Sequence, residues 1–309
     1  MNQRQYDKKV LFVNKLLKLF GIITSLGMLL VLLMGAVVTK TGSGDGCGNS
    51  WPLCYGKVLP EAPALETIIE LSHRVVSAAL GLLVIILAIW SWKKIGHIRE
   101  TKFLAIVSVF LIVFQGLLGA AAVVWGQSDI VLASHFGFSL ASFASVVLLT
   151  ILAFEASGSQ KKPTVPKRIR YNLYGVTIYS YIVVYSGALV RHTGASMACD
   201  NVPFCTDGQL LAFTGQQGIQ MLHRTAAVLI FVWLLYILII GMKELKNEVT
   251  MRRGIIIAFT FVSLQALSGI LVVVSNLNLF LALFHGLFIS GLFTVLLYLV
   301  MLSLRSRRQ

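Results

Sequence analysis

Long uncharged apolar runs alternate with short polar segments along the whole of this chain. A run of roughly 20 apolar residues is enough to cross the hydrocarbon core of a membrane. The first run is too long for a signal-peptide core and lacks a clear small-residue cleavage site, so we expect it to remain as a helix. Eight runs predict eight transmembrane helices, at 17–39, 69–91, 103–125, 131–153, 173–190, 222–242, 254–275 and 279–303.

The composition supports an all-α integral membrane protein. The chain is 57% hydrophobic and only 12% charged, whereas a soluble domain carries about 25% charged residues. The net charge of +14 might suggest a nucleic-acid partner, but the basic residues gather in alternate polar segments. Most of the 26 Lys and Arg residues lie in 1–18, 92–102, 154–172, 243–253 and 304–309. The positive-inside rule therefore predicts that both termini are cytoplasmic, and the basic charge is a topology signal that calls for no nucleic-acid partner.

All cysteines fall in the two long loops expected on the outer, extracellular side, 40–68 and 191–221. The four residues are Cys47, Cys54, Cys199 and Cys205. An even number confined to the oxidising side predicts two disulfides, Cys47–Cys54 and Cys199–Cys205. Four free thiols are the alternative. A zinc site is disfavoured because neither pair has the Cys-x-x-Cys spacing.

The two halves of the chain repeat the same polar residues. His73 and His135 stand in the first half, and His223 and His285 follow 150 residues later in both cases. Glycines, cysteines, prolines and an arginine recur at nearly the same offset. We therefore expect two pseudo-symmetric four-helix bundles related by a parallel internal repeat. The expected segments are a cytoplasmic tail (1–16), a first half (17–155), a cytoplasmic linker (156–171), a second half (172–303) and a tail (304–309).

The four repeated histidines are candidate heme ligands. Each lies near the outer end of an even-numbered span. Alternate spans run in the same direction, so both members of a pair should lie at a similar depth. Two histidines facing each other across a bundle can hold heme iron from both sides. Interhelical hydrogen bonds, proton relays and copper are the alternatives, and copper is disfavoured because no third ligand lies at a suitable spacing.

One position breaks the repeat beside a histidine. Glu70 precedes His73 by three residues on the same helix face, and Gln220 occupies the matching position. An acidic residue within a span indicates function: Glu70 would accept a proton or stabilise positive charge. Pairing with Arg74 is the structural alternative. Arg74 and Arg224 follow the histidines directly and would either bind heme propionates or extend to the outer interface.

Several of these motifs together resemble the heme A synthases of the Bacillus type. They are TKTGSG at 39–44, Cys47 with WPLC at 51–54, ELSHR at 70–74 and MLHR at 221–224. The resemblance covers about residues 17–303. Only the N-terminal extension of about 16 residues lies outside it.

The resemblance implies an oxidoreductase of the bacterial plasma membrane that acts on a methyl group. Such enzymes oxidise the C8 methyl of heme O to a formyl group with oxygen from water, which gives heme A for terminal oxidases. It implies heme b as electron-transfer cofactor at His223 and His285, and heme O as substrate between His73 and His135 beside Glu70. It further implies heme O synthase as partner, while the electron acceptor is not identified by the sequence.

The resemblance also assigns the disulfides: Cys47–Cys54 matches a pair implicated in activity, and Cys199–Cys205 matches a structural one. The main rival function is a diheme b-type cytochrome that moves electrons between a quinol and an acceptor. A transporter would need broken helices with polar residues at mid-membrane. A heme chaperone would not need the acid at Glu70.

Overall fold

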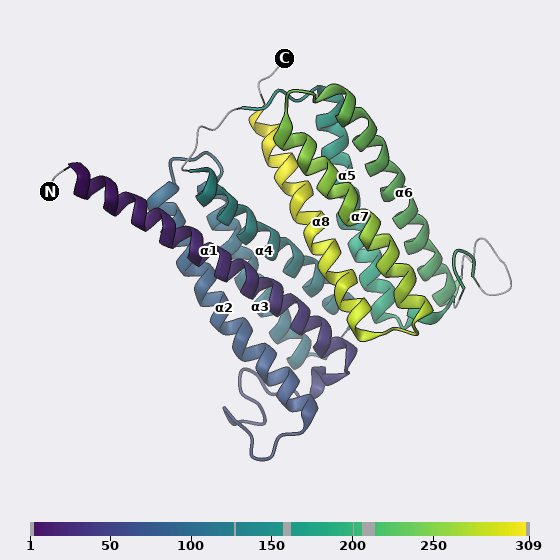
Figure 1. Cartoon of the computed structure of the whole chain (residues 1–309). Coiled ribbons are helices and arrows are strands. Elements are labelled where there is room, and N and C mark those ends of the chain that lie inside the picture. Colours follow the sequence, from purple (N-terminus) through teal and green to yellow (C-terminus); the bar gives the residue numbers. More distant parts are fainter. Residues whose placement is uncertain (1–2, 127, 157–161, 200, 206–213, 307–309) are drawn as a thin grey trace. The chain divides into compact units, whose positions relative to one another are not determined.

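The computed structural model describes residues 3–126, 128–156, 162–199, 201–205 and 214–306, with side chains from Lys15 onward. The regular structure of these residues is helical throughout, with eight long α-helices and two short 3-10 helices (Figure 1). Each long helix contains a segment long and apolar enough to cross a membrane. The prediction of an all-α protein with eight apolar helices is therefore confirmed.

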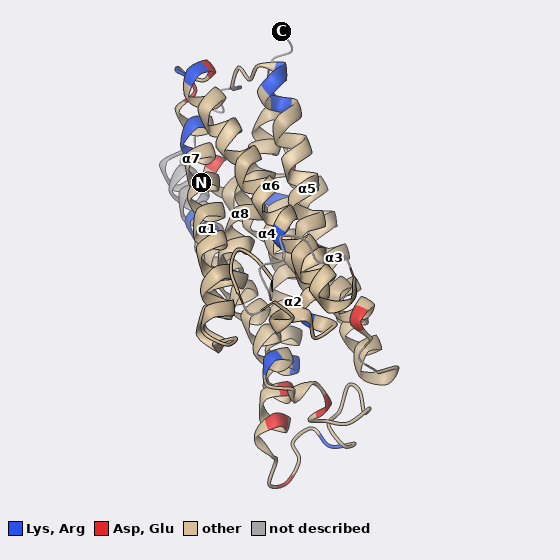
Figure 2. Cartoon of the chain, turned by 90° about the vertical axis from the view of Figure 1, so that its right-hand side faces the viewer, with Lys and Arg blue, Asp and Glu red and all other residues tan. Residues whose placement is uncertain are grey.

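The helices extend beyond the apolar runs that predicted them. α1 begins at Gln3, so residues 3–16, expected as a tail, are helical. Pro166 precedes α5, where its fixed φ favours a helix start, and the Asn278 side chain caps α8. In Figure 2 the helix shafts carry long uncharged stretches. The bounds are α1 Gln3–Lys40, η1 Ser43–Asp45, α2 Leu65–Ile95, α3 Thr101–Val124, α4 Asp129–Glu155, α5 Lys167–His192, η2 Ala195–Met197, α6 Gly215–Glu244, α7 Val249–Val274 and α8 Leu279–Arg305.

The chain forms two compact units that are divided within α4. The first unit holds residues 1–126 and 138–161, and the second holds 127–137 and 162–309. The first turns of α4, including His135, belong to the second unit, whereas the division of the sequence repeat expected near residue 156 stays a prediction. Gly137 abuts the Tyr185 ring of α5: a Cβ at this glycine would come within 2.6 Å of the ring.

In the first unit, α2 packs against both α1 and α3. Gly27 of α1 lets Leu80 of α2 approach closely, since a Cβ at this glycine would lie 2.4 Å from the leucine. α4 contacts α1 through its Thr150, whose Oγ1 lies 3.1 Å from Ser25 Oγ. The same helix contacts α3 through an edge-to-face pair of Phe114 and Phe138.

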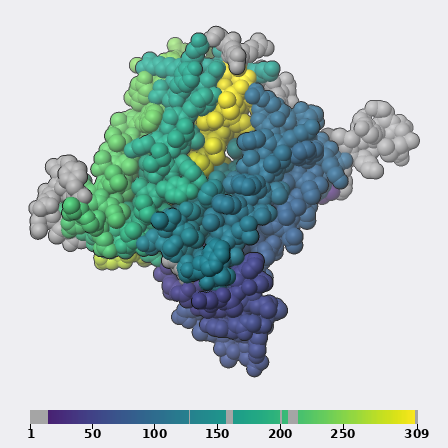
Figure 3. Space-filling view, turned by 180° about the vertical axis from the view of Figure 1, so that it is seen from behind, coloured from purple at the N-terminus to yellow at the C-terminus, as the bar shows by residue number. Residues whose placement is uncertain are grey.

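In the second unit the four helices α5–α8 close into a ring. α5 contacts α6 and α8, and α7 contacts the same two helices. The teal α5 and the yellow α8 can be followed side by side in Figure 3. Because α6 and α8 each lie between α5 and α7, they occupy opposite corners of the bundle. Residues on α6 and α8 can therefore face each other across its centre.

Candidate functional site

Both long loops are closed by disulfides. Cys47 is bonded to Cys54 between α1 and α2, and Cys199 is bonded to Cys205 between α5 and α6. All four side chains are buried. Both predicted pairings are confirmed. Each loop also contains a short 3-10 helix that follows a glycine with positive φ, Gly42 in one loop and Gly194 in the other.

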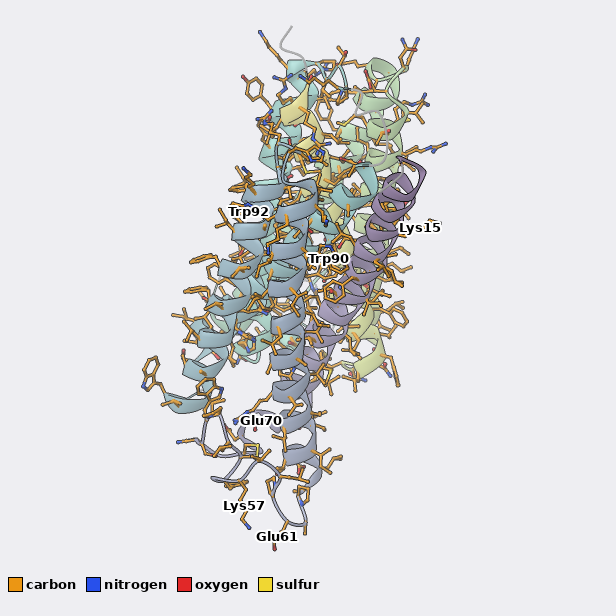
Figure 4. The ribbon with its side chains drawn as sticks, turned by 90° about the vertical axis from the view of Figure 1, so that its left-hand side faces the viewer. Lys15, Lys57, Glu61, Glu70, Trp90 and Trp92 are labelled. Carbon is orange, nitrogen blue, oxygen red and sulfur yellow. A yellow bond between two sulfur atoms is a disulfide. The ribbon has the colours of Figure 1, made fainter. Side chains whose placement is uncertain are left out.

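Glu70 joins the first loop to α2. Its side chain is almost fully buried, with 3% of its surface exposed. Its Oε2 accepts a hydrogen bond from the Cys47 backbone N–H at 2.7 Å, and its Oε1 forms an ion pair with Arg74. Figure 4 shows Glu70 where α2 meets the loop, whereas Lys57 and Glu61 lie at the loop's far edge. The pairing with Arg74, one of the two alternatives from the sequence, is therefore present.

Arg74 connects this carboxylate to the loop backbone. Its Nη1 donates to the Ser50 carbonyl at 2.8 Å and to the Leu53 carbonyl at 3.3 Å. Thr67 adds a further anchor, because its Oγ1 donates to the Gly46 carbonyl at 2.6 Å. One guanidinium thus balances a buried charge and satisfies two carbonyl groups, which are costly to bury without hydrogen bonds.

The second loop uses the matching residues with an amide in place of the acid. Gln220 Oε1 accepts from the Cys199 N–H at 2.6 Å, and its Nε2 donates to the Ser196 carbonyl at 3.0 Å. Arg224 donates to loop carbonyls, and the distances are 2.6 Å to Asn201, 3.3 Å to Phe204 and 2.9 Å to Cys199. Sequence reasoning missed this role, because it expected propionates or an extended side chain. The sequence signal for this role is the His-Arg pair that recurs in the helix after each cysteine loop.

Three of the four histidines lie against a glycine on a neighbouring helix. A Cβ would come within 3.3 Å of His73 if added at Gly35 and within 2.9 Å of His223 if added at Gly187. For His285 the corresponding distance is 3.1 Å, from Gly269. The glycines make room for an imidazole between packed helices. Their recurrence was visible in the sequence, but their position under the rings was not predicted.

The second unit also places a serine hydroxyl on each histidine. Ser186 Oγ lies 2.8 Å from His223 Nδ1, and Ser268 Oγ lies 3.0 Å from His285 Nδ1. The Gln265 amide nitrogen lies 2.9 Å from His285 Nε2. These histidines stand on α6 and α8, the opposite corners of the bundle. Because imidazole nitrogens can bind heme iron, His223 and His285 are the residues of this bundle that could hold a heme, with the Gln265 amide next to one of the candidate ligand atoms.

The histidines of the first pair belong to different units. His73 lies on α2 in the first unit, and His135 lies on the part of α4 that belongs to the second. Their pairing therefore stays a prediction. In the first unit, the described geometry brings His73 together with Gly35, and Glu70 together with Arg74 and the disulfide loop.

Eight membrane-spanning helices, two disulfide-closed loops and four partly buried histidines define a class of multi-pass membrane proteins with candidate heme sites. A family described as cytochrome oxidase assembly proteins matches residues 18–297. The chain is 53% identical to the heme A synthase of Bacillus cereus (strain AH187) over 297 residues, which is 96% of each chain. The heme A synthase of Bacillus anthracis (strain CDC 684 / NRRL 3495) gives the same identity and coverage. The chain therefore belongs to the heme A synthases, oxidoreductases of the cytochrome oxidase assembly family.

Proposed function

We propose that this chain oxidises the C8 methyl group of heme O to a formyl group and so produces heme A for terminal oxidases. The observation that carries the proposal is the 53% identity to heme A synthases over 96% of the chain. The overall change is two successive two-electron oxidations in which one water supplies the oxygen. Each half has a different role in this reaction.

The second half is proposed to hold heme b between His223 and His285. Support comes from the closed bundle, in which these residues stand on opposite corners with their Nδ1 atoms next to serine hydroxyls. When bound, heme b would supply a one-electron acceptor for the reaction. The protein's part is to hold both imidazoles neutral and correctly turned, and to exclude water from the bundle.

The first half is proposed to bind substrate heme O at His73 and His135, beside Glu70. Loss of electrons from the methyl carbon develops positive charge, which a nearby buried carboxylate stabilises more strongly than it would in water. Glu70 would also accept a proton from the attacking water. Its bonds to Arg74 and to the Cys47 amide hold the carboxylate in a fixed position.

The membrane topology is part of the same proposal. Both termini and the linker at 156–171 face the cytoplasm, and the two disulfide loops face outward, in line with the positive-inside rule. The equal spacing of the histidines, together with the matching loop contacts of Glu70 and Gln220, supports a parallel internal repeat. Heme O synthase is the proposed protein partner because its product is the substrate here.

Heme extraction and chromatography from cells that make heme O test this function directly. Cells with the chain should convert heme O to heme A, and cells without it should accumulate heme O. A variant with Glu70→Gln serves as a folded, inactive control. If heme O is unchanged while purified protein carries two equivalent b-type hemes, the chain is instead an electron-transferring diheme cytochrome.

A further inference from the structure

We infer that Ser186 and Ser268 are positioning residues that fix the tautomer of His223 and His285 and so make the second-half heme a permanent cofactor. The inference rests on the proposed function, which places heme b between these histidines. It adds a physical reason why one half retains its porphyrin and the other releases it.

The Ser186 hydroxyl lies between two partners. Its Oγ is 2.8 Å from the Val183 carbonyl oxygen, one helical turn back on α5, and 2.8 Å from His223 Nδ1. A serine hydroxyl has a single hydrogen and two lone pairs. When His223 Nε2 binds iron, the imidazole proton is on Nδ1, so the ring donates to Ser186 while the hydroxyl donates to the Val183 carbonyl.

Ser268 repeats this arrangement on another helix. Its Oγ donates to the Gln265 carbonyl at 3.0 Å and lies 3.0 Å from His285 Nδ1. The Gln265 amide nitrogen approaches the opposite ring nitrogen, Nε2, at 2.9 Å. An amide N–H can donate there only if Nε2 is unprotonated. A proton on Nδ1, as in a histidine that binds metal through Nε2, lets Ser268 accept from the ring and is compatible with both contacts.

Both serines directly precede the glycine that underlies the same histidine. The dipeptides are Ser186-Gly187 beside His223 and Ser268-Gly269 beside His285. The glycine makes room for the ring, and the serine fixes its rotation. At the matching positions of the first half the dipeptides are Met34-Gly35 and Leu118-Gly119. The glycine is kept there, while the hydroxyl is replaced by a side chain that cannot accept a strong hydrogen bond.

This difference suits the two proposed roles. A hydrogen bond from the distal ring nitrogen of a metal-binding histidine raises the ligand's basicity and fixes its orientation. Losing such a partner typically costs about 10-fold to 100-fold in metal affinity. A cofactor that relays electrons in every turnover benefits from tight ligation. A substrate that must leave as product benefits from ligation without this serine contact.

The test uses full-length protein purified in detergent with its heme bound. The variants are Ser186→Ala, Ser268→Ala and both together. Transfer of heme b to excess apomyoglobin should be about tenfold faster or more for each single variant. The midpoint potential of the bound heme should rise, because a less basic imidazole stabilises ferric iron less. Ser186→Thr and Ser268→Thr keep the hydroxyl and should restore both properties.

Matched controls lie on the same two helices. Ser180 on α5 donates to the Thr177 carbonyl at 2.8 Å, and Ser263 on α7 donates to the Phe259 carbonyl at 2.9 Å. Ser180→Ala and Ser263→Ala lose a comparable helix-internal bond and should leave heme transfer and potential unchanged. If the Ser186 and Ser268 variants behave like these controls, the inference is overturned.

A further variant adds a hydroxyl beside a histidine of the first half and leaves the second half unchanged. Met34→Ser should place a hydroxyl next to the glycine under His73 and slow the transfer of heme O from loaded protein to apomyoglobin. Unchanged transfer would contradict the explanation of substrate release. The proposed function fails separately: full b-type absorbance in His223→Ala would refute the heme b assignment, whereas its loss there with unaltered serine variants would refute only this inference.

Discussion

The disulfide loops of the two units are held by matching contacts but differ in one charge. In the first, the Cys47 amide donates to the Glu70 carboxylate, which is paired with Arg74. In the second, the Cys199 amide donates to the neutral Gln220, and the arginine turns to the Cys199 carbonyl instead. The amide shows that the loop does not need a carboxylate for its architecture. The negative charge in the first unit therefore calls for a functional explanation.

The largest expected effect separates charge from shape at this position. Glu70→Gln keeps the acceptor for the Cys47 amide, as Gln220 does for Cys199. It should nevertheless lower heme A formation about 10²–10⁴-fold, the usual range for losing a general acid–base group. Bound heme b should remain, as judged by the reduced spectrum.

The reciprocal change, Gln220→Glu, is the matched control. It should preserve most of the heme A output because the proposed chemistry lies in the other half. Normal output from Glu70→Gln would remove Glu70 from the mechanism, and equal losses in both variants would show that the site is only structural.

The next prediction compares the stability lost when either arginine is replaced. Arg74→Gln leaves a buried carboxylate without its counter-charge, which should cost about 3–5 kcal/mol of stability. Arg224→Gln loses hydrogen bonds to carbonyl groups only and should cost about 1–3 kcal/mol. Thermal unfolding in detergent measures both, and Arg74→Lys should recover part of the loss. A larger cost at Arg224 would contradict the contrast.

The two disulfides should contribute equally to the stability of the protein but unequally to its function. Replacing either pair by serine removes the closure of a short loop, worth about 2–3 kcal/mol in the chain-entropy model. The Cys47–Cys54 loop also carries the amide that fixes Glu70. Loss of this pair should therefore reduce heme A formation in addition to stability, while loss of Cys199–Cys205 should reduce stability alone. Equal activity in the two variants would count against the role of the first loop.

The smallest effect concerns the loop anchor at Thr67. Thr67→Val removes the hydroxyl that donates to the Gly46 carbonyl and should cost about 1 kcal/mol. Thr260 is the control, because its hydrogen bond to the Ile256 carbonyl is exposed, and Thr260→Val should change stability much less. A shift of the unfolding midpoint in Thr67→Val no larger than in Thr260→Val would show that this anchor is dispensable.

The sequence predicted the helices and the disulfides because both leave local signals. Runs of apolar residues specify helices in a membrane regardless of what packs around them. Helix ends were harder to predict from the sequence. α1 extends to Gln3 through a polar stretch that a hydropathy pattern does not include. The assignment of 127–137 to the second unit depends on tertiary contacts such as that of Gly137 with Tyr185, which no local pattern reports.

The sequence drew attention to the candidate residues that carry unusual chemistry. It did not draw attention to the residues that contact them. Histidines, an intramembrane acid and cysteines are rare enough to be noticed. Ser186 and Ser268 resemble any small polar residue in an apolar helix, and only the fold brings their hydroxyls to imidazole nitrogens. The carbonyl groups bound by Arg74 depend on the path of the loop, which the sequence does not encode locally.

The central claim is that the two halves hold two different porphyrins, one as reactant and one as electron relay. Extraction and chromatography of the hemes bound to purified His73→Ala and His223→Ala proteins, from cells that make heme O, test it most directly. The account predicts that heme b disappears from His223→Ala and persists in His73→Ala, which instead loses heme O and heme A. Loss of the same heme from both variants would contradict it.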